Sequence, residues 1–314
     1  MKLAEAIDDY LYFKQSIGFR FREAVRTLRS FSRALGGLDI GEVEGNAVLA
    51  FLNGSGPVTT YWRQKFIILS GFYRFAVGRG YVCSSPLPQT LPKFPPAMMP
   101  YVYSPEQIKR LVSLTESLWT RASPLQAESF RTLLLLLCGT GLRIHEALSL
   151  KLEDVRLEDR FLIVRKTKFF KTRIVPMGPR LTQELRSYAT KRCRLPCPFG
   201  EGSTFFCTRS GHPLSYERVD KVFRRLRSQA GVCREKTARY QPRIHDFRAT
   251  FAVHCLLGWY RQGRDVQRLL PQLSTYLGHV GIRGTQRYLQ LTPELLQEAN
   301  VRFEIYAREV THAD

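Results

Sequence analysis

The sequence predicts a mainly α-helical protein of two domains, with one small antiparallel β-sheet in the second domain. A length of 314 residues exceeds one domain of about 100–200 residues, and apolar residues recur at helical spacing in both halves. Seven prolines concentrate between Pro86 and Pro105, where each removes a backbone donor and restricts the residue before it. We therefore expect a helical domain over residues 1–85, a proline-rich linker over 86–103 and an α+β domain over 104–314.

The composition argues against membrane-spanning and disulfide-rich secreted proteins. Hydrophobic residues make up 44% of the chain, yet the longest apolar run, Leu133 to Cys138, is far shorter than the roughly 20 residues that span a bilayer. The residues after Met1 lack the basic and unbroken apolar stretches of a secretion signal. Seven cysteines, an odd number in a long chain, are not typical of a disulfide framework. We expect a cytoplasmic protein with no membrane partner.

The charge of the chain predicts a polyanionic partner. The 48 lysines and arginines outnumber the 27 acidic residues, which gives a net charge of +21 at pH 7. Such a charge attracts polyanions over many ångströms, and each DNA phosphate that a cation neutralises releases a condensed counterion. Nucleic acid is therefore the expected partner, and a basic protein without such a partner is the alternative.

Four helices are expected in the first domain, over residues 3–17, 21–35, about 44–53 and 60–77. The second of them carries, beside its apolar face, an arginine stripe at spacings of four, three and four residues: Arg22, Arg26, Arg29 and Arg33. Such a helix can pack on its own core and present guanidinium groups to phosphate, although a solvated face has the same pattern. On the fourth helix, Arg63 and Lys65 are expected to point outward as further DNA contacts.

The second domain combines helices with short strands. Ser104, followed by proline and then Gln107 three residues later, is typical of a helix start. The run from Phe130 to Cys138 predicts a buried helix that ends at the following glycines, and the pattern from Tyr216 onward is helical. Strands are expected at Phe161–Val164 and Arg173–Pro176, with a candidate third strand at Phe205–Cys207.

Four short segments of the second domain carry candidate chemistry. Three of them pair polar residues at short spacing: Arg143 with Glu146, His245 with Arg248, and His279 with Tyr288. The i+3 spacing lets Glu146 hold Arg143 in one rotamer, although a structural ion pair has the same spacing. The fourth segment is the turn between the two strands, which brings several cations close together. A bound phosphate would reduce the electrostatic repulsion among them. These cations are Lys166, Lys168, Lys171 and Arg173.

Taken together, these segments resemble the tyrosine recombinases, also called the phage integrase family. The run Thr-Gly-Leu-Arg-Ile-His-Glu-Ala-Leu is similar to the family's first arginine box, and His-Asp-Phe-Arg is similar to its His-x-x-Arg box. A lysine in the turn precedes Arg-Ile-Val-Pro, and Leu-Gly-His is followed by Thr-Gln-x-Tyr at a suitable distance. One departure is Ala249, where the family often has histidine. The resemblance covers the whole chain, because the first domain resembles the family's core-binding domain.

The resemblance implies a role for each of six residues in breaking a DNA phosphodiester. Tyr288 attacks the phosphorus and forms a 3′-phosphotyrosyl link, while Arg143 and Arg248 bind the non-bridging oxygens. The remaining three are Lys168, which donates a proton to the leaving 5′ oxygen, His245, which accepts the proton of the tyrosine, and His279, which donates a hydrogen bond to the phosphate. This chemistry requires no metal, no ATP and no other cofactor.

The resemblance also implies the partners. They are double-stranded DNA with specific recombination sites and further copies of this chain, in a homotetramer on DNA and a monomer or dimer when free. A helix at about 293–308 is expected to pack into a neighbouring copy, with packing in cis as the alternative. Integration, excision or resolution of a mobile element on the bacterial nucleoid is the expected biology.

The sequence is also compatible with three other functions. A type IB topoisomerase shares the chemistry, and an inactive site-specific DNA-binding protein could share the fold. Zinc binding is the third, suggested by Cys193, Cys197, Cys207 and His212, although their spacing fits no standard ligand pattern.

Overall fold

The computed structural model describes residues 1–19, 21–95, 98–120, 126–165, 172–235, 237–290, 295, 297, 298, 300 and 301. Only the backbone is described for Arg22 and Gln290. The chain divides into two compact units, Met1–Ala97 and Met98–Asp314, and the division falls within the segment expected to be a linker.

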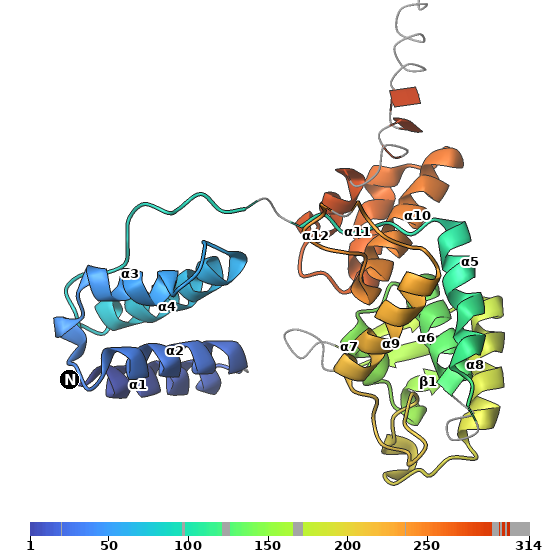
Figure 1. The fold of residues 1–314 in the computed structure, drawn as a ribbon, viewed down its shortest axis with the longest axis horizontal. Helices are drawn as coiled ribbons and strands as arrows, with labels where there is room; N and C mark the ends of the chain where they lie inside the picture. The colour runs from blue at the N-terminus through green and yellow to red at the C-terminus, as the bar shows by residue number, and fades with distance from the viewer. Residues whose placement is uncertain are drawn as a thin grey trace, which may run out of the picture. The chain divides into compact units, whose positions relative to one another are not determined.

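The first unit is helical, as the apolar spacing predicts. It contains α1 (Leu3–Ser16), α2 (Arg22–Leu35), the 3₁₀ helix η1 (Ile40–Glu42), α3 (Gly45–Asn53) and α4 (Thr60–Gly78), drawn in blue in Figure 1. Phe31, which the sequence places at the margin of the apolar face of α2, is fully buried. The reason is tertiary, because its ring meets Phe51 of α3 at 5.0 Å and Tyr73 of α4 at 6.4 Å.

The second unit is built around one buried helix, α6 (Gln126–Thr140), which contacts helices on several sides (Figure 1). Ser104 caps the first helix of the unit through a capping box with Gln107, as expected. The other helices are α5 (Pro105–Ser113), α7 (Ile144–Leu148), α8 (Pro179–Arg192), α9 (Tyr216–Gln229), α10 (Phe247–Arg261), α11 (Val266–Leu277) and α12 (Arg283–Gln286). Short 3₁₀ helices are η2 (Leu114–Leu118), η3 (Leu152–Asp154), η5 (Gly200–Gly202), η6 (Ile244–Asp246) and η7 (Arg287–Gln290).

The sheet has three antiparallel strands in the order β1-β2-β3. They are β1 (Val155–Arg156), β2 (Phe161–Val164) and β3 (Arg173–Pro176), of which the last two were expected. The expected third strand at Phe205–Cys207 is wrong, since this segment makes only an isolated bridge from Cys207 to Pro213. Its apolar run reflects packing: Phe205 and Phe206 are buried against Tyr188 of α8.

Each unit holds part of the proline-rich segment. Phe94 packs against Trp62 of the first unit, with ring centroids 5.7 Å apart. Tyr103 is buried in the second unit, where its ring stacks on Phe247 at 4.5 Å and its backbone N–H donates to Thr250 Oγ1. No helix within the described part of the chain is long and apolar enough to cross a membrane.

Candidate active site

Arg143 lies at the junction between α6 and α7. Gly141 makes this turn with φ +59°, and a Cβ there would lie 2.6 Å from the Phe251 ring, so that only glycine fits. Arg143 is the N-cap of α7: its backbone N–H donates to Glu146 Oε2 (3.0 Å) and its Nη1 donates to Glu146 Oε1 (2.8 Å). The structure thus confirms that Glu146 holds Arg143 across the i+3 spacing.

Glu146 also binds a second arginine, from β3. Arg173 Nη1 donates to Oε1 (3.1 Å) and Nη2 donates to Oε2 (2.8 Å), and both side chains are only about a tenth exposed. Burial alone would raise the pKa of this carboxyl, but the hydrogen bonds and charge of Arg173, followed by those of Arg143, lower it to about 2. Arg173 was expected to contact phosphate from the turn; the structure instead engages it with protein groups.

Arg248, in the first turn of α10, is 3% exposed. Its Nη1 donates to the carbonyl of Gly141 (2.9 Å) and its Nη2 to the carbonyl of Leu277 (2.6 Å). Burial, and after it the charge of Arg143, lowers its pKa to about 10, so the guanidinium stays protonated at neutral pH.

Three arginines converge on the C-terminal end of α11. The last carbonyls of a helix lack intrahelical partners and carry the negative end of its dipole, so cations are favoured there. Three successive carbonyls each accept a hydrogen bond from one arginine. The Tyr276 carbonyl accepts from Arg173 Nε (3.1 Å), that of Leu277 from Arg248 Nη2 (2.6 Å) and that of Gly278 from Arg143 Nη2 (3.4 Å).

Both candidate histidines lie near these arginines. His279, directly after α11, is 2.7 Å from Thr285 Oγ1 through Nδ1, and burial followed by the Arg248 charge lowers its pKa to about 4. His245 lies in η6 with its side chain exposed. Desolvation by the protein around it, and after that the charge of Arg248, lowers the pKa of His245. Both rings are therefore neutral at pH 7 in the free protein.

Tyr288 lies in η7 beside His279, with ring centroids 6.0 Å apart. Its side chain is 6% exposed and packs in an apolar cluster with residues of α10 and α11. An ionised Tyr288 would raise the pKa of Arg248, which places the tyrosine within electrostatic reach of that arginine. The structure thus brings together four of the six expected catalytic residues around the end of α11: Arg143, Arg248, His279 and Tyr288, with His245 close to the arginines.

Several expected contacts fall outside the described residues. Lys166, Lys168 and Lys171 belong to the undescribed stretch 166–171, and the side chain of Arg22 is not described. Their roles stay predictions.

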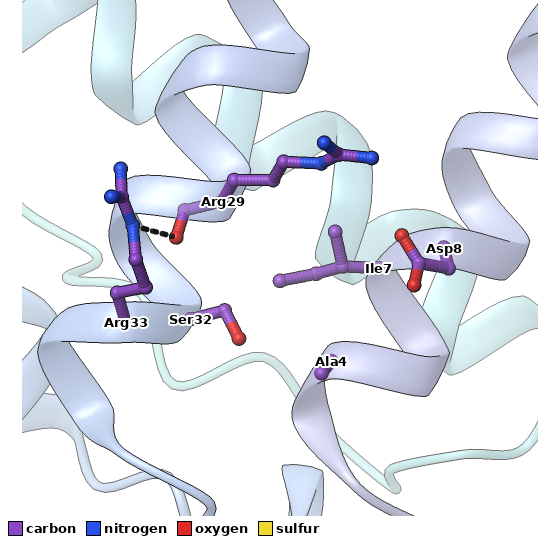
Figure 2. Close-up of a pocket in the computed structure, with 6 residues that line it drawn as sticks. All are labelled: Ala4, Ile7, Asp8, Arg29, Ser32 and Arg33. Carbon is purple, nitrogen blue, oxygen red and sulfur yellow. Dashed lines mark hydrogen bonds between the residues drawn. The ribbon is translucent and has the colours of Figure 1, made fainter.

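The first unit carries the remaining expected DNA contacts. Arg26, Arg29 and Arg33 are exposed on α2. Two of them, with Ser32, line a hollow of about 490 Å³ opposite Asp8 and its neighbours on α1, and Arg33 Nε donates to the Arg29 carbonyl at 3.3 Å (Figure 2). Arg29 and Arg33 thus lie together at this hollow, and phosphate binding by the arginines of α2 stays a prediction.

Arg63 and Lys65 on α4 differ from each other. Arg63 is exposed, with its guanidinium 5.6 Å from the Phe94 ring. Lys65 Nζ instead donates to the carbonyl of Phe51 (2.7 Å) at the end of α3, and desolvation lowers its pKa. Its ammonium therefore caps a helix of its own unit.

A basic face on α9 was missed by the sequence reasoning. Arg218, Lys221 and Arg225 are exposed at spacings of three and four residues, opposite the buried Val219, Phe223 and Leu226. The start of α9 lies beside α7, because the rings of His145 and Tyr216 are 4.9 Å apart. The helical spacing of these cations was the signal that could have found them.

The described residues contain no cluster of side chains that could hold a metal ion. No three histidine, cysteine or acidic side chains there come close enough to hold an ion. Cys193 is exposed, Cys207 is buried, and Cys197 Sγ lies 3.5 Å from the buried Arg192. The proposed zinc set does not assemble in the described structure.

The lowered pKa of His279 gives a testable dependence of stability on pH. The unfolded imidazole, with its ordinary pKa of 6.5, takes up a proton before the folded one, whose pKa is about 4. We therefore expect the free energy of unfolding to fall by about 1–2 kcal/mol more in the wild type than in His279→Gln between pH 7 and pH 4.5, measured by urea denaturation. The exposed His212→Gln serves as the control, and equal pH dependence in wild type and His279→Gln would contradict the prediction.

Comparison with known proteins identifies a shared family. The model of the phage integrase family matches residues 102–294. A putative integrase/recombinase of Sinorhizobium fredii, y4rB, is 35% identical over 305 residues, which cover 96% of this chain and 96% of that protein. The tyrosine recombinase XerA of Pyrococcus furiosus is 31% identical over 214 residues, which cover 68% of this chain and 62% of that protein.

Solved structures share the fold. The Tn1549 transposon integrase in complex with transposon right end DNA matches with a TM-score of 0.71 and 18% identity, covering 98% of this chain and 100% of that chain. A λ integrase tetramer bound to a Holliday junction matches with a TM-score of 0.63 and 18% identity, covering 90% of this chain and 78% of that chain.

Proposed function

This chain belongs to the phage integrase family of tyrosine recombinases, and we propose that it cuts and rejoins double-stranded DNA at specific sites through Tyr288. The observation that carries this proposal is the convergence of Arg143, Arg248 and His279 on one end of α11, beside Tyr288. Topoisomerase activity shares this chemistry, and the family favours recombination.

The reaction is a transesterification at one DNA phosphate. The Tyr288 oxygen forms a bond to phosphorus while the bond from phosphorus to the 5′ oxygen breaks. The product is a 3′-phosphotyrosyl link and a free 5′ hydroxyl, which keeps the energy of the ester for the rejoining step. Attack by the 5′ hydroxyl of another strand reverses the chemistry and completes an exchange.

Arg143 and Arg248 neutralise the charge that grows on the non-bridging oxygens. Each guanidinium has five N–H donors, of which the described contacts use only some. The rest remain for phosphate, and the contacts to carbonyls and to Glu146 fix both groups before DNA arrives. Donors fixed in this way stabilise a transition state without reorganising during the reaction.

The contact of His279 with Thr285 supports one tautomer of its ring. The Thr285 hydroxyl lies 2.7 Å from Nδ1. In the proposed tautomer this hydroxyl donates to Nδ1, and the proton on Nε2 is the donor to phosphate. His245, neutral at pH 7, accepts the proton of Tyr288 directly or through water, and Lys168 supplies the proton to the 5′ oxygen.

Trapping of covalent DNA tests the proposed function. Cells that express the chain are lysed in denaturant, and the DNA that stays on the protein is sequenced. We expect adducts at a few related sequences, and a plasmid that carries two copies of such a sequence should recombine. Absence of adducts would overturn the proposal, and adducts dispersed without sequence preference together with relaxation of supercoils would show a topoisomerase.

The exposed arginines of α2 are proposed to bind the DNA backbone, with the first unit as the core-binding domain. Replacing Arg26, Arg29 and Arg33 with glutamine should lower DNA affinity and flatten the slope of log affinity against log salt by about 2.7, since each lost phosphate contact removes about 0.9. The control removes the same charge elsewhere in the unit, at the exposed Arg74, Arg79 and Lys93. An equal effect of both triple variants would contradict a specific role for α2.

The active assembly is proposed to be a homotetramer on two DNA duplexes in the bacterial cytoplasm, in which the end of the chain couples neighbouring copies. The segment expected as an exchange helix, 293–308, lies largely outside the described residues. Within the single chain, Leu295 is buried against the cluster of Tyr288, and Arg261 pairs with Glu298 at 3.2 Å, so the start of the segment packs in cis. Coupling is therefore assigned to the residues beyond Val301.

Truncation after Val301 tests this coupling, because it retains the contacts of Leu295 and Glu298. The shortened chain should bind DNA and form the covalent adduct but complete few exchanges on a two-site plasmid. A chain that ends after Arg308 is the control. Strand exchange at the normal rate by the shorter chain would show that these residues do not couple the copies.

A further inference from the structure

Arg173 stands outside the six residues that the reaction uses, yet it is held by the same end of α11. We infer that Arg173 is a positioning residue, which satisfies Glu146 so that Arg143 stays directed to the DNA phosphate. This inference rests on the proposed function and gives Arg173 a role other than phosphate contact.

The contacts of Arg173 are all to protein. Its Nη1 and Nη2 bind the two oxygens of Glu146 and its Nε donates to the Tyr276 carbonyl, so every nitrogen of the guanidinium has a partner. The side chain is 12% exposed. The described contacts of Arg143 and Arg248 use two guanidinium nitrogens each, so Arg173, with all three engaged, is the least free of the three to bind a phosphate.

Gly278 leaves the space that the Arg173 guanidinium occupies. A Cβ at this position would lie 2.8 Å from Arg173 Nη1 and 3.0 Å from its Cζ, and the backbone has φ +69°. Glycine is therefore needed here for two independent reasons: the left-handed conformation and the guanidinium that lies against its Cα. The carbonyl of the same glycine accepts from Arg143 Nη2, so both arginines meet at one residue.

The role of Arg173 follows from how Glu146 shares its lone pairs. Each carboxylate oxygen accepts two hydrogen bonds, one from Arg173 and one from Arg143. If Arg173 is removed, a buried carboxylate keeps a single cationic partner. A bidentate pair is the strong geometry for arginine and carboxylate, so Arg143 would turn fully onto Glu146 and lose its contact with Gly278. The positive charge meant for phosphate would then be neutralised within the protein.

Cleavage kinetics with Arg173→Gln test the inference. The substrate is a duplex of the trapped sequence, nicked beside the cleavage point so that the released fragment diffuses away. We expect the single-turnover rate at saturating protein to fall about 10–100-fold with DNA affinity changed less than about twofold, because the loss lies in transition-state stabilisation. Arg131→Gln, which breaks an ion pair with Glu184 (2.7 Å) in the same unit, is the control for lost pairing and should cleave normally.

Two outcomes of this measurement would overturn the inference. Weaker DNA binding with a smaller salt slope and an unchanged rate at saturation would make Arg173 a phosphate contact. Effects of Arg173→Gln and Glu146→Gln that multiply in the double variant would show that the two residues act separately. We expect instead that the double variant cleaves about as fast as Glu146→Gln alone, because a neutral amide in place of the Glu146 carboxylate no longer draws Arg143 away.

A crystal structure of Arg173→Gln without DNA gives a readout that needs no cleavage. We expect the Arg143 guanidinium to pair with Glu146 through two hydrogen bonds and to leave the Gly278 carbonyl. An Arg143 in its wild-type position would overturn the inference even if recombination is established. Absence of covalent DNA on the wild-type chain would overturn the proposed function alone, so the two failures are distinguishable.

Discussion

Tyr288→Phe is expected to bind DNA with unchanged affinity and to form no covalent adduct. The variant lacks only the hydroxyl, and the ring remains in the apolar cluster of α10 and α11 where it is buried. Without the oxygen no bond to phosphorus can form, so the loss should be complete rather than partial. Gel electrophoresis in denaturant measures the adduct, and fluorescence anisotropy with a labelled duplex measures binding.

Tyr240→Phe provides the matched control, because Tyr240 is an exposed tyrosine of the same unit. It should form adduct at the wild-type rate. An adduct that survives denaturant in Tyr288→Phe would assign the nucleophile to another residue, and Tyr276 on α11 would then be the first to test.

Local structure was predictable where neighbouring residues decide it. The capping box at Ser104 fixes the start of α5 through atoms three residues apart. The hydrogen bond between Arg143 and Glu146 was likewise accessible, because helix geometry places i and i+3 together. The failure at Phe205–Cys207 has the opposite cause. An apolar run shows that a segment is buried, and only the fold decides whether a strand or a packed loop buries it.

The use of each cation could not be derived from the sequence. Arg173 and Lys65 both appeared free to bind DNA, yet each donates to carbonyl oxygens of distant segments, which for Arg173 is Tyr276, 103 residues away. The sequence shows that a side chain is cationic but not which group it contacts. Backbone carbonyls at helix ends are the recurring acceptors: those of α3 accept from Lys65, and those of α11 accept from three arginines. Arg26, Arg29 and Arg33 of α2 differ, because their side chains are exposed.

Arg248→Gln is expected to lower the single-turnover cleavage rate by about 10³-fold, the scale of losing a fixed transition-state donor in a water-excluded site. Arg248 is the most buried of the arginines at the end of α11, and its two carbonyl contacts, from Gly141 and Leu277, tie α6 to α11. The substitution should therefore also lower the melting temperature, because buried carbonyls lose their donors. Arg248→Lys should recover little activity, since an ammonium cannot reach both carbonyls and a phosphate oxygen at once.

A change of substrate separates the catalytic loss in Arg248→Gln from the structural one. A duplex with a methylphosphonate at the cleavage point carries no charge on that phosphorus group, so it needs less positive charge in the transition state. We expect the ratio of wild-type to variant rates to shrink by at least about tenfold on this substrate, while the difference in melting temperature stays the same. A ratio that is unchanged on the neutral substrate would mean that Arg248 holds the fold of the site and does not itself stabilise the phosphate.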